Sequence, residues 1–244
     1  SFTDMSGGAA EMAPSYSHEY APPEKLAEQG IVRRRRWCES SDGGQTWKAF
    51  REIDVSDPFA PQPDFTLPLD DGSTLVIGGI WSAWDYAKDT YANVGHTMAW
   101  SSPDGGITLS QPVSLNDPKE MTSFCGGPKQ LRDGTVVVAA YGTFDTTHPN
   151  PTTDAWLWFS EDSGKSWSKP LLLASGIATR TNDEPAVAEL GNGDLLVVLR
   201  HSNPQAEGAA LYLNCGQVIV KRSESGWMAG EWQSTPMGFR GFPA

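Results

Sequence analysis

The sequence predicts an all-β fold, a β-propeller built from four-stranded antiparallel blades. One observation behind this is a short phrase that occurs three times, at residues 40–47, 102–109 and 160–167. It reads Ser-x-Asp-x-Gly-x-Thr/Ser-Trp, with Leu109 as the single departure at the last position. Two further observations are a series of hairpin turns in phase with the phrase and a set of apolar, β-branched runs beside those turns.

The repeated phrase has the composition of a tight turn. Its aspartates are 62 and 58 residues apart, which is typical of stacked or radially arranged supersecondary units. Asp and Gly favour the turn, the Asp side chain accepts hydrogen bonds from the turn's own amides, and Trp packs beneath it. We therefore expect three equivalent turns whose structural residues are Asp42, Trp47, Asp104, Asp162 and Trp167.

Two-residue hairpin turns are predicted at Asp71-Gly72, Asp133-Gly134 and Asn192-Gly193. Each turn precedes an apolar run that reads as a strand, at residues 74–77, 135–138 and 195–198. Further strand-like runs lie at residues 97–100, 155–159 and 218–221, each just before a copy of the phrase. The last of them leads into a degenerate fourth copy, residues 222–225.

The repeating unit is therefore strand, hairpin, strand, variable loop, strand, phrase, strand. Four antiparallel strands in about sixty residues correspond to one propeller blade. Helical periodicity is weak except over residues 23–29. We assign residues 1–29 to an irregular N-terminal arm and residues 30–244 to a partial propeller.

The length of 244 residues accommodates about three and a half such units. Propellers close with typically 4–8 blades, so a six-bladed ring of these units needs roughly 360 residues. We expect further polypeptide to complete the propeller, either covalently or as a partner in a larger assembly; a small ring is the alternative. The chain begins with Ser, and we recognise no signal peptide and no apolar run long enough for a membrane span, so we expect a processed or partial sequence. An extracellular or lumenal location is slightly favoured.

The net charge of −12 disfavours nucleic acid and anionic membranes as partners, because phosphate contacts need clustered Lys and Arg. The one basic run, residues 33–36, distributes its side chains over both faces of a strand. The three cysteines are irregularly spaced and show no metal-ligand pattern, so one disulfide with a free thiol and three free thiols both remain open. We expect no metal and no cofactor.

The repeated phrase resembles the Asp box of sialidases and other propellers. Residues 182–200 resemble a sialidase segment in which a Glu and an Arg are sixteen residues apart, as Glu184 and Arg200 are. The resemblance implies that Glu184 takes a proton from a nucleophilic Tyr and that Arg200 grips the carboxylate of sialic acid. A guanidinium fork pairs bidentately with a carboxylate, and a Tyr nucleophile is a known exception among glycosidases.

Several sialidase features are missing from this sequence. No Arg-Ile-Pro motif supplies the first arginine of the triad, and only Asp4 precedes Asp42, where an acid/base Asp is expected. The third arginine and the Tyr nucleophile are expected beyond Ala244. This chain on its own is therefore not expected to hydrolyse a sialoside.

An aromatic loop beginning at Trp81 and including Asp85 is a second candidate for carbohydrate contact. Exposed rings on propeller loops stack on sugar faces and carboxylates bind hydroxyls, although aromatic residues also pack between blades. Three functions remain open: a sialidase-like glycoside hydrolase that cleaves sialic acid or a related acidic sugar when complete, a non-catalytic scaffold propeller of a larger assembly, and a carbohydrate-binding propeller.

Overall fold

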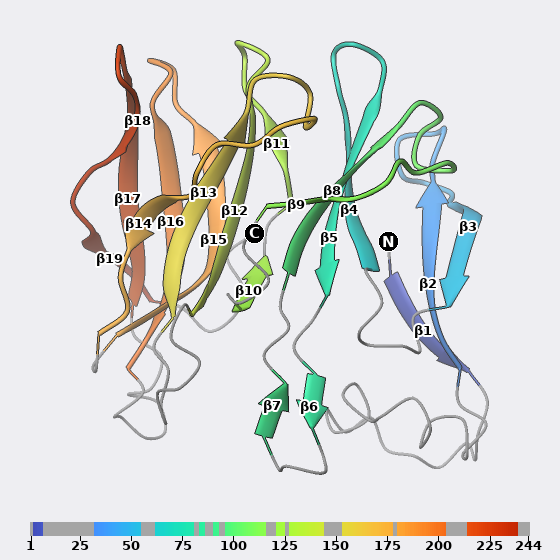
Figure 1. Cartoon of the computed structure of the whole chain (residues 1–244), viewed down its shortest axis with the longest axis horizontal. Helices are drawn as coiled ribbons and strands as arrows, with labels where there is room; N and C mark the ends of the chain where they lie inside the picture. Colours follow the sequence, from blue (N-terminus) through green and yellow to red (C-terminus); the bar gives the residue numbers. More distant parts are fainter. Residues whose placement is uncertain are drawn as a thin grey trace.

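Antiparallel sheets make up the described part of the protein, and Figure 1 shows four of them side by side in chain order. The structure, a computed structural model, describes residues 2–6, 32–54, 62–80, 83–85, 90–92, 96–115, 121–124, 127–143, 153–177, 180–203 and 214–238. Every assigned element in these ranges is a strand. The prediction of an all-β chain is confirmed.

The first two sheets come from the N-terminal half of the chain. The first has three strands in the order β1 (Phe2–Ser6), β2 (Val32–Glu39) and β3 (Lys48–Asp54). The second has four strands, β4 (Gln62–Pro68), β5 (Thr74–Ile80), β8 (His96–Ser102) and β9 (Val113–Ser114). A separate two-stranded ribbon, β6 (Ala83–Asp85) and β7 (Thr90–Ala92), lies within the connection from β5 to β8.

The last two sheets repeat the four-stranded plan, each with one additional strand. The third runs β10 (Met121–Phe124), β12 (Val136–Thr143), β13 (Asp154–Ser160) and β14 (Leu171–Ala174), and β11 (Lys129–Gln130) also pairs with β12. The fourth runs β15 (Thr181–Glu189), β16 (Leu195–Ser202), β17 (Asn214–Ser223) and β18 (Gly226–Ala229), and β19 (Gln233–Gly238) also pairs with β17. The expected four-stranded antiparallel unit is thus observed.

The N-terminal segment expected to be an irregular arm contains one strand. β1 pairs antiparallel with β2, with Phe2 opposite Arg36 and Ser6 opposite Val32. Its place beside the third strand of a unit is the place that β5, β12 and β16 occupy in the other sheets. The apolar alternation of a strand is hard to recognise in so short a polar run. Residues 7–31, including the weak helical pattern at 23–29, lie outside the described residues.

The hairpin loops contain three residues instead of the two predicted. In the first, the Leu69 amide donates to the Ser73 carbonyl and the Gly72 amide donates to the Leu69 carbonyl. The same pair of bonds closes the loops at residues 131–135 and 190–194. Only the glycine of each loop has positive φ, whereas a two-residue type I′ turn requires it at both central residues. The side chain at the residue before the glycine binds its own loop, so that Asp71 Oδ1 accepts from the Ser73 amide at 2.9 Å.

The three copies of the repeated phrase form one turn with one hydrogen-bond network. In the first copy the Gly44 amide donates to Ser40 Oγ at 2.8 Å, and the Thr46 amide donates to Asp42 Oδ1 at 2.9 Å. The Ser40 hydroxyl also donates to Asp42 Oδ1 at 2.8 Å. Corresponding bonds recur around Asp104 and Asp162, with distances between 2.7 and 2.8 Å. The expectation of three equivalent turns is met in these contacts.

The degenerate fourth copy does not adopt this turn. Ser223 pairs with Gly226, which leaves a two-residue loop between β17 and β18. The segment lacks the aspartate that accepts the turn amides. The Ser223 hydroxyl instead donates to the Gly226 carbonyl at 2.9 Å.

The apolar core lies between successive sheets, and β13 contributes side chains to it on both of its faces. Its alternate residues Trp156 and Trp158 are fully buried in a cluster shared with the second sheet, together with Leu75 and Ile77. Leu157 and Phe159 point to the opposite face, into a cluster shared with the fourth sheet. Because successive side chains in a strand point to opposite faces, a strand buried on both faces is apolar throughout. The sheets are therefore stacked face to face.

The second and third repeated turns also pack against the preceding sheet. Gly106 lies against the ring of Trp37, and Gly164 lies against Leu75. The tryptophans of the phrase contribute unequally to this packing. Trp167 is half-buried beside the second cluster, but Trp47 is 66% exposed. Trp47 does contact its own turn, because its indole N–H donates to the Gly44 carbonyl at 3.1 Å as that of Trp167 does to the Gly164 carbonyl. It stays exposed because, among the described residues, no preceding sheet stands beside the first turn.

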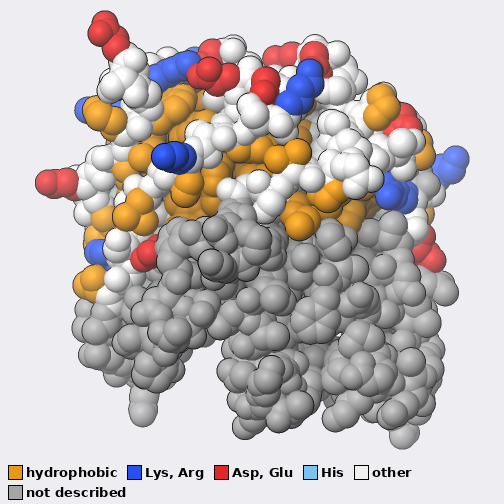
Figure 2. All heavy atoms as spheres, viewed as in Figure 1, with side chains coloured by type: hydrophobic (Ala, Val, Ile, Leu, Met, Phe, Trp, Pro, Cys, Tyr) orange, Lys and Arg blue, Asp and Glu red, His pale blue; other side chains and the backbone are white. Residues whose placement is uncertain are grey.

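Two ends of the sheets can be distinguished in Figure 1. The hairpin loops and the repeated turns lie together at the upper end, and the ribbon β6–β7 lies at the lower end. Figure 2 shows side chains of both charges gathered along the upper end, above a band of apolar side chains. In the second, third and fourth sheets the strands β5, β12 and β16 run toward the lower end, where residues 80, 143 and 202 end them.

Candidate functional site

A β-bulge displaces Glu184 from the regular ladder between β15 and β16. Asp183 pairs with Arg200 and Ala186 with Val198, so Glu184 and Pro185 together face one residue of β16. Glu184 has φ +49°, although the residue before a proline normally favours extended backbone. Bulges re-aim side chains and are common next to active sites, and proline is accepted within a sheet at such positions.

The bulge brings the Glu184 carboxylate against the Arg200 guanidinium. Arg200 Nε lies 2.6 Å from Glu184 Oε2, and Arg200 Nη2 lies 3.7 Å from Asp183 Oδ2. The Nε–H bond is not directed at the carboxylate, so the short contact is an ion pair without an aligned hydrogen bond. The Arg200 side chain is 23% exposed and that of Glu184 only 5%, so the ion pair is accessible to solvent on the side of the arginine.

Hydroxyl groups hold the neighbouring Asp183 in place. Thr153, which precedes β13 in the adjacent sheet, donates to Asp183 Oδ1 at 2.5 Å. Thr181 and Ser202 donate to Asp183 Oδ2 at 2.7 and 3.2 Å. The Asn182 amide also donates to the Thr153 carbonyl at 3.1 Å. A buried carboxylate satisfied in this way is fixed in position, and it ties the third sheet to the fourth.

The environment of Glu184 favours its protonated form. Burial raises the pKa of the Glu184 carboxyl above its ordinary value. The Arg200 guanidinium acts in the opposite direction without cancelling this effect, and the adjacent Asp183 charge raises the pKa of Glu184 further. A carboxyl with these properties is suited to accept and release a proton.

The other residues proposed from the sequence have separate places. Asp42, Asp104 and Asp162 lie in the repeated turns at the upper end. Asp85 ends β6 in the ribbon at the lower end, and Trp81 lies outside the described residues. The sequence analysis did not include Asp183 in the candidate site. The available signal was its position directly before Glu184, in an apolar strand interrupted by a proline, which indicates a bulge.

Within the ranges that the structure describes, no group of three or more His, Cys, Asp or Glu side chains is placed to hold a metal ion. Cys38 and Cys215 are both free thiols. The same ranges contain no helix that is long and apolar enough to cross a membrane.

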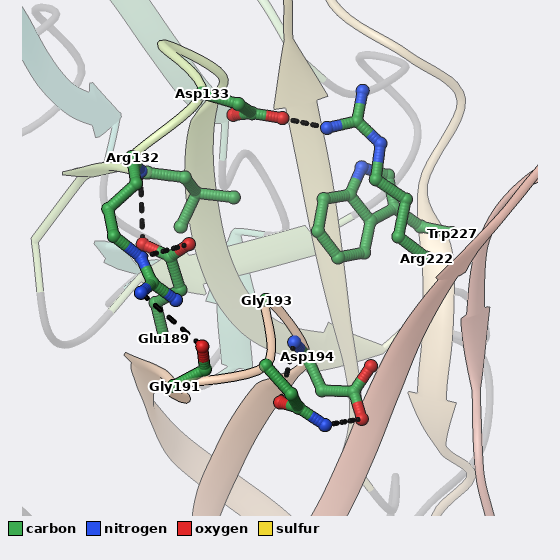
Figure 3. A pocket seen from close by; sticks show the side chains of 10 residues that line it. Arg132, Asp133, Glu189, Gly191, Gly193, Asp194, Arg222 and Trp227 are labelled. Atoms are coloured by element: carbon green, nitrogen blue, oxygen red, sulfur yellow. Dashed lines mark hydrogen bonds and ion pairs between the residues drawn. The ribbon is translucent and has the colours of Figure 1, made fainter.

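A cavity of about 440 Å³ lies at the upper end, between the third and fourth sheets (Figure 3). Its lining combines two hairpin loops with residues of the β17–β18 segment: Leu131, Arg132, Asp133, Glu189, Gly191, Asn192, Gly193, Asp194, Arg222 and Trp227. Asp194 and Glu189 come from the two ends of the hairpin that joins β15 to β16.

Polar groups of this cavity are paired with one another (Figure 3). Arg132 Nε lies 3.0 Å from Glu189 Oε1, and its guanidinium also donates to the Leu190 carbonyl. Arg222 pairs with Asp133, and its guanidinium lies over the ring of Trp227. These pairs join the turn of one sheet to the turn of the next. We therefore interpret the cavity as a seam between sheets and place the candidate site at the opposite end, around Arg200.

No family model and no curated protein matches the sequence. Solved structures do match the fold. A protein of unknown function from Dyadobacter fermentans DSM 18053 has a TM-score of 0.63 and 21% identity, over 91% of this chain and 64% of that one. An ulvan lyase of polysaccharide lyase family PL25 has a TM-score of 0.53 and 12% identity, over 83% of this chain and 49% of that one.

A third structural neighbour is an endo-arabinase from Bacteroides thetaiotaomicron VPI-5482. Its TM-score is 0.51 with 16% identity, over 84% of this chain and 73% of that one. The ulvan lyase has also been solved bound to -[GlcA(1-4)Rha3S]-, and that structure has a TM-score of 0.50. The chain thus spans 64% of the Dyadobacter protein and about half of the ulvan lyase. At these identities the likeness establishes the fold: a propeller-like arrangement of antiparallel sheets that is shared with carbohydrate-active proteins.

Proposed function

We propose that this chain belongs to a β-propeller that binds and processes an acidic carbohydrate at the end where Arg200 and Glu184 meet. In this proposal Arg200 grips a sugar carboxylate and Glu184 is the group that exchanges a proton. The observation that carries it is the strained bulge at Glu184, which has φ +49° and places a buried carboxylate 2.6 Å from Arg200. Strain of this kind costs free energy and is concentrated at functional sites.

The structural neighbours support the carbohydrate part of the proposal. The ulvan lyase and the endo-arabinase both act on polysaccharides, and one lyase structure holds a saccharide that contains GlcA. Fold alone does not determine function, so the argument for an acidic sugar rests on the arginine. A guanidinium recognises the planar carboxylate that sialic and uronic acids share. The sixteen-residue spacing from Glu184 to Arg200 favours sialic acid as the first acid to test.

The second candidate is a non-catalytic propeller that scaffolds a larger assembly. The ion pair between Arg200 and Glu184 favours this second candidate, because an arginine that pairs with a carboxylate of its own chain can have a purely structural role. The two candidates differ in one respect. A scaffold needs Arg200 only for stability, whereas a carbohydrate site needs it for the acidic ligand.

Binding and turnover of three saccharides test the proposal. The purified protein is incubated with 3′-sialyllactose, with a glucuronate-containing polysaccharide and with neutral arabinan. Release of sialic acid, ultraviolet absorbance of unsaturated uronate and formation of reducing ends report the three reactions, and calorimetry reports binding. We expect an acidic saccharide to bind more tightly than arabinan.

The substitution Arg200→Lys identifies the site, because lysine keeps the charge but does not pair bidentately. We expect a loss of at least tenfold in affinity for the acidic saccharide, with a melting temperature close to that of the wild type. The matched control is Arg132→Lys, which makes the same change at an ion-paired arginine at the opposite end. Equal losses in the two variants, or equal binding of arabinan and the acidic saccharides, would contradict the proposal.

A further inference from the structure

Arg200 contacts two carboxylates that differ in how firmly each is held. Hydroxyls from Thr153, Thr181 and Ser202 occupy both oxygens of Asp183. Among the described residues, the Glu184 carboxylate has a single polar partner, Arg200. Asp183 therefore cannot leave without breaking several hydrogen bonds, whereas Glu184 needs only to give up Arg200.

A ligand carboxylate approaches this cluster from the side of the arginine. Arg200 is the most exposed member of the cluster, at 23%, while Glu184 and Asp183 are exposed by 5% and 8%. An incoming carboxylate that pairs with the guanidinium must take the place that Glu184 holds on Nε. Glu184 therefore competes with the ligand carboxylate for Arg200.

Charge balance requires a proton when this exchange takes place. With both carboxylates ionised, the free cluster carries −1, and a bound carboxylate makes it −2. Like charges in a poorly solvated site repel strongly, and the departing Glu184 has no second cation among the described residues. Protonation of Glu184 returns the cluster to −1 and removes the repulsion.

Within the described residues, the charged groups that act on Glu184 are Arg200 from β16 and Asp183 from β15. Thr153, which faces the cluster from the adjacent sheet, is uncharged. His201 follows Arg200 on β16 and so points to the other face of the sheet, where its ring meets Trp232 edge-on at 5.3 Å. Burial already raises the pKa of Glu184, and loss of the Arg200 contact would raise this pKa further, so the exchange favours protonation of Glu184.

Building on the proposed function, we propose that a substrate carboxylate displaces Glu184 from Arg200 with uptake of one proton by Glu184, while Asp183 holds Arg200 in place. The proton comes from solvent and no covalent bond changes. Asp183 is then a positioning residue and Glu184 a determinant of specificity. Binding of an acidic saccharide is then coupled to proton uptake by Glu184. Binding of a neutral saccharide is not, because it brings no carboxylate to displace Glu184 from Arg200.

Calorimetry in buffers of different ionisation enthalpy measures this proton directly. The protein is titrated with 3′-sialyllactose and, separately, with a glucuronate-containing oligosaccharide, at several pH values. We expect the uptake of about one proton per ligand between the pKa of Glu184 in the free protein and its higher pKa in the complex, and affinity that weakens about tenfold per pH unit in that interval.

Two variants separate the roles of the carboxylates. In Glu184→Gln the side chain keeps its shape but cannot titrate, so proton uptake and the pH dependence of affinity should both disappear. In Asp183→Asn the proton uptake should remain while the affinity falls, because Arg200 is no longer held. Glu189→Gln, at the hairpin end of the same strand, is the control and should leave both quantities unchanged.

The outcomes distinguish this inference from the function on which it rests. Binding of an acidic saccharide without proton uptake, or with undiminished uptake in Glu184→Gln, would overturn the exchange and leave the proposed function standing. Failure of both saccharides to bind at any pH would overturn the proposed function and the exchange together.

Discussion

Gly106 lies against the indole ring of Trp37, and a Cβ added at residue 106 would be 2.7 Å from Cζ3 of that ring. The contact joins the second repeated turn to the preceding sheet. The adjacent Gly105 has a similar backbone, with φ +73° beside +97° at Gly106, but open space surrounds its own Cβ position. Substitutions at these two glycines therefore distinguish the free-energy cost of backbone strain from the cost of the steric contact between sheets.

We expect Gly106→Ala to destabilise the protein by about 2–5 kcal/mol, which combines left-handed strain with overpacking against Trp37. Gly105→Ala should cost only the strain, about 1–2 kcal/mol. Urea unfolding of both variants measures the difference. Equal losses would show that the turn does not press on Trp37.

The tryptophans of the first and third turns should differ in importance. Trp167 is half-buried, so Trp167→Ala should cost about 2 kcal/mol, below the range for a fully buried tryptophan. Trp47 is 66% exposed, and Trp47→Ala should change stability by no more than about 0.5 kcal/mol. Thermal melting of the two variants tests this ranking, and a larger loss for Trp47→Ala would reverse it.

Acid should weaken the repeated turns. Hydrogen bonds from the Thr46 hydroxyl, the Thr46 amide and the Ser40 hydroxyl lower the pKa of Asp42 to about 2, from 3.8. The Thr108 hydroxyl and amide lower the pKa of Asp104 in the same way. A depressed pKa contributes stability that is fully present above the unfolded value and is lost as pH falls through the folded value. Stability should therefore drop between pH 4 and about 2.

Denaturant titrations between pH 5 and 2 measure that loss. Asp104→Asn should show a weaker dependence on pH than the wild type, because one of the contributing carboxylates no longer titrates. A wild-type protein whose stability is constant over this range would contradict the assignment of the turn bonds to ionised aspartates.

Glu184 and Glu189, on the same strand, should affect stability with opposite signs. Burial raises the pKa of Glu184, so its ionised form costs stability above the folded pKa and the cost disappears as pH falls. Burial also acts to raise the pKa of Glu189, but hydrogen bonds from the Arg132 amide and guanidinium outweigh it, and the pKa is lowered. Glu189 therefore contributes stability above its unfolded pKa, and this contribution is lost in acid.

Stability curves of the two glutamine variants check both signs. Relative to Glu184→Gln, the wild type should lose stability as pH rises above the ordinary glutamate pKa of 4.5. Relative to Glu189→Gln, it should gain stability as pH rises from 3 to 6. The same trend in both comparisons would show that one of the two carboxylates has been assigned the wrong environment.

The repeated turns could be predicted because their chemistry is local. Asp42 binds an amide only four residues away, and the same residues recur at the other two turns. The hairpin glycines and the apolar strands beside them are equally local, so the sequence by itself determined the all-β class and the order of strands. The two-residue length predicted for each hairpin loop was wrong, because Asp-Gly is compatible with both two-residue and three-residue loops.

The surroundings of the candidate site were decided by tertiary structure. Glu184 and Arg200 are sixteen residues apart, and only the one-residue bulge at Pro185 turns the carboxylate toward the guanidinium. Asp183 is fixed by Thr153, a residue that precedes a strand of another sheet, and Trp47 is exposed because no preceding sheet stands beside its turn among the described residues. Such contacts depend on register and on stacking between sheets. A single shift of register moves every side chain to the other face, and turn chemistry does not encode how one sheet packs on the next.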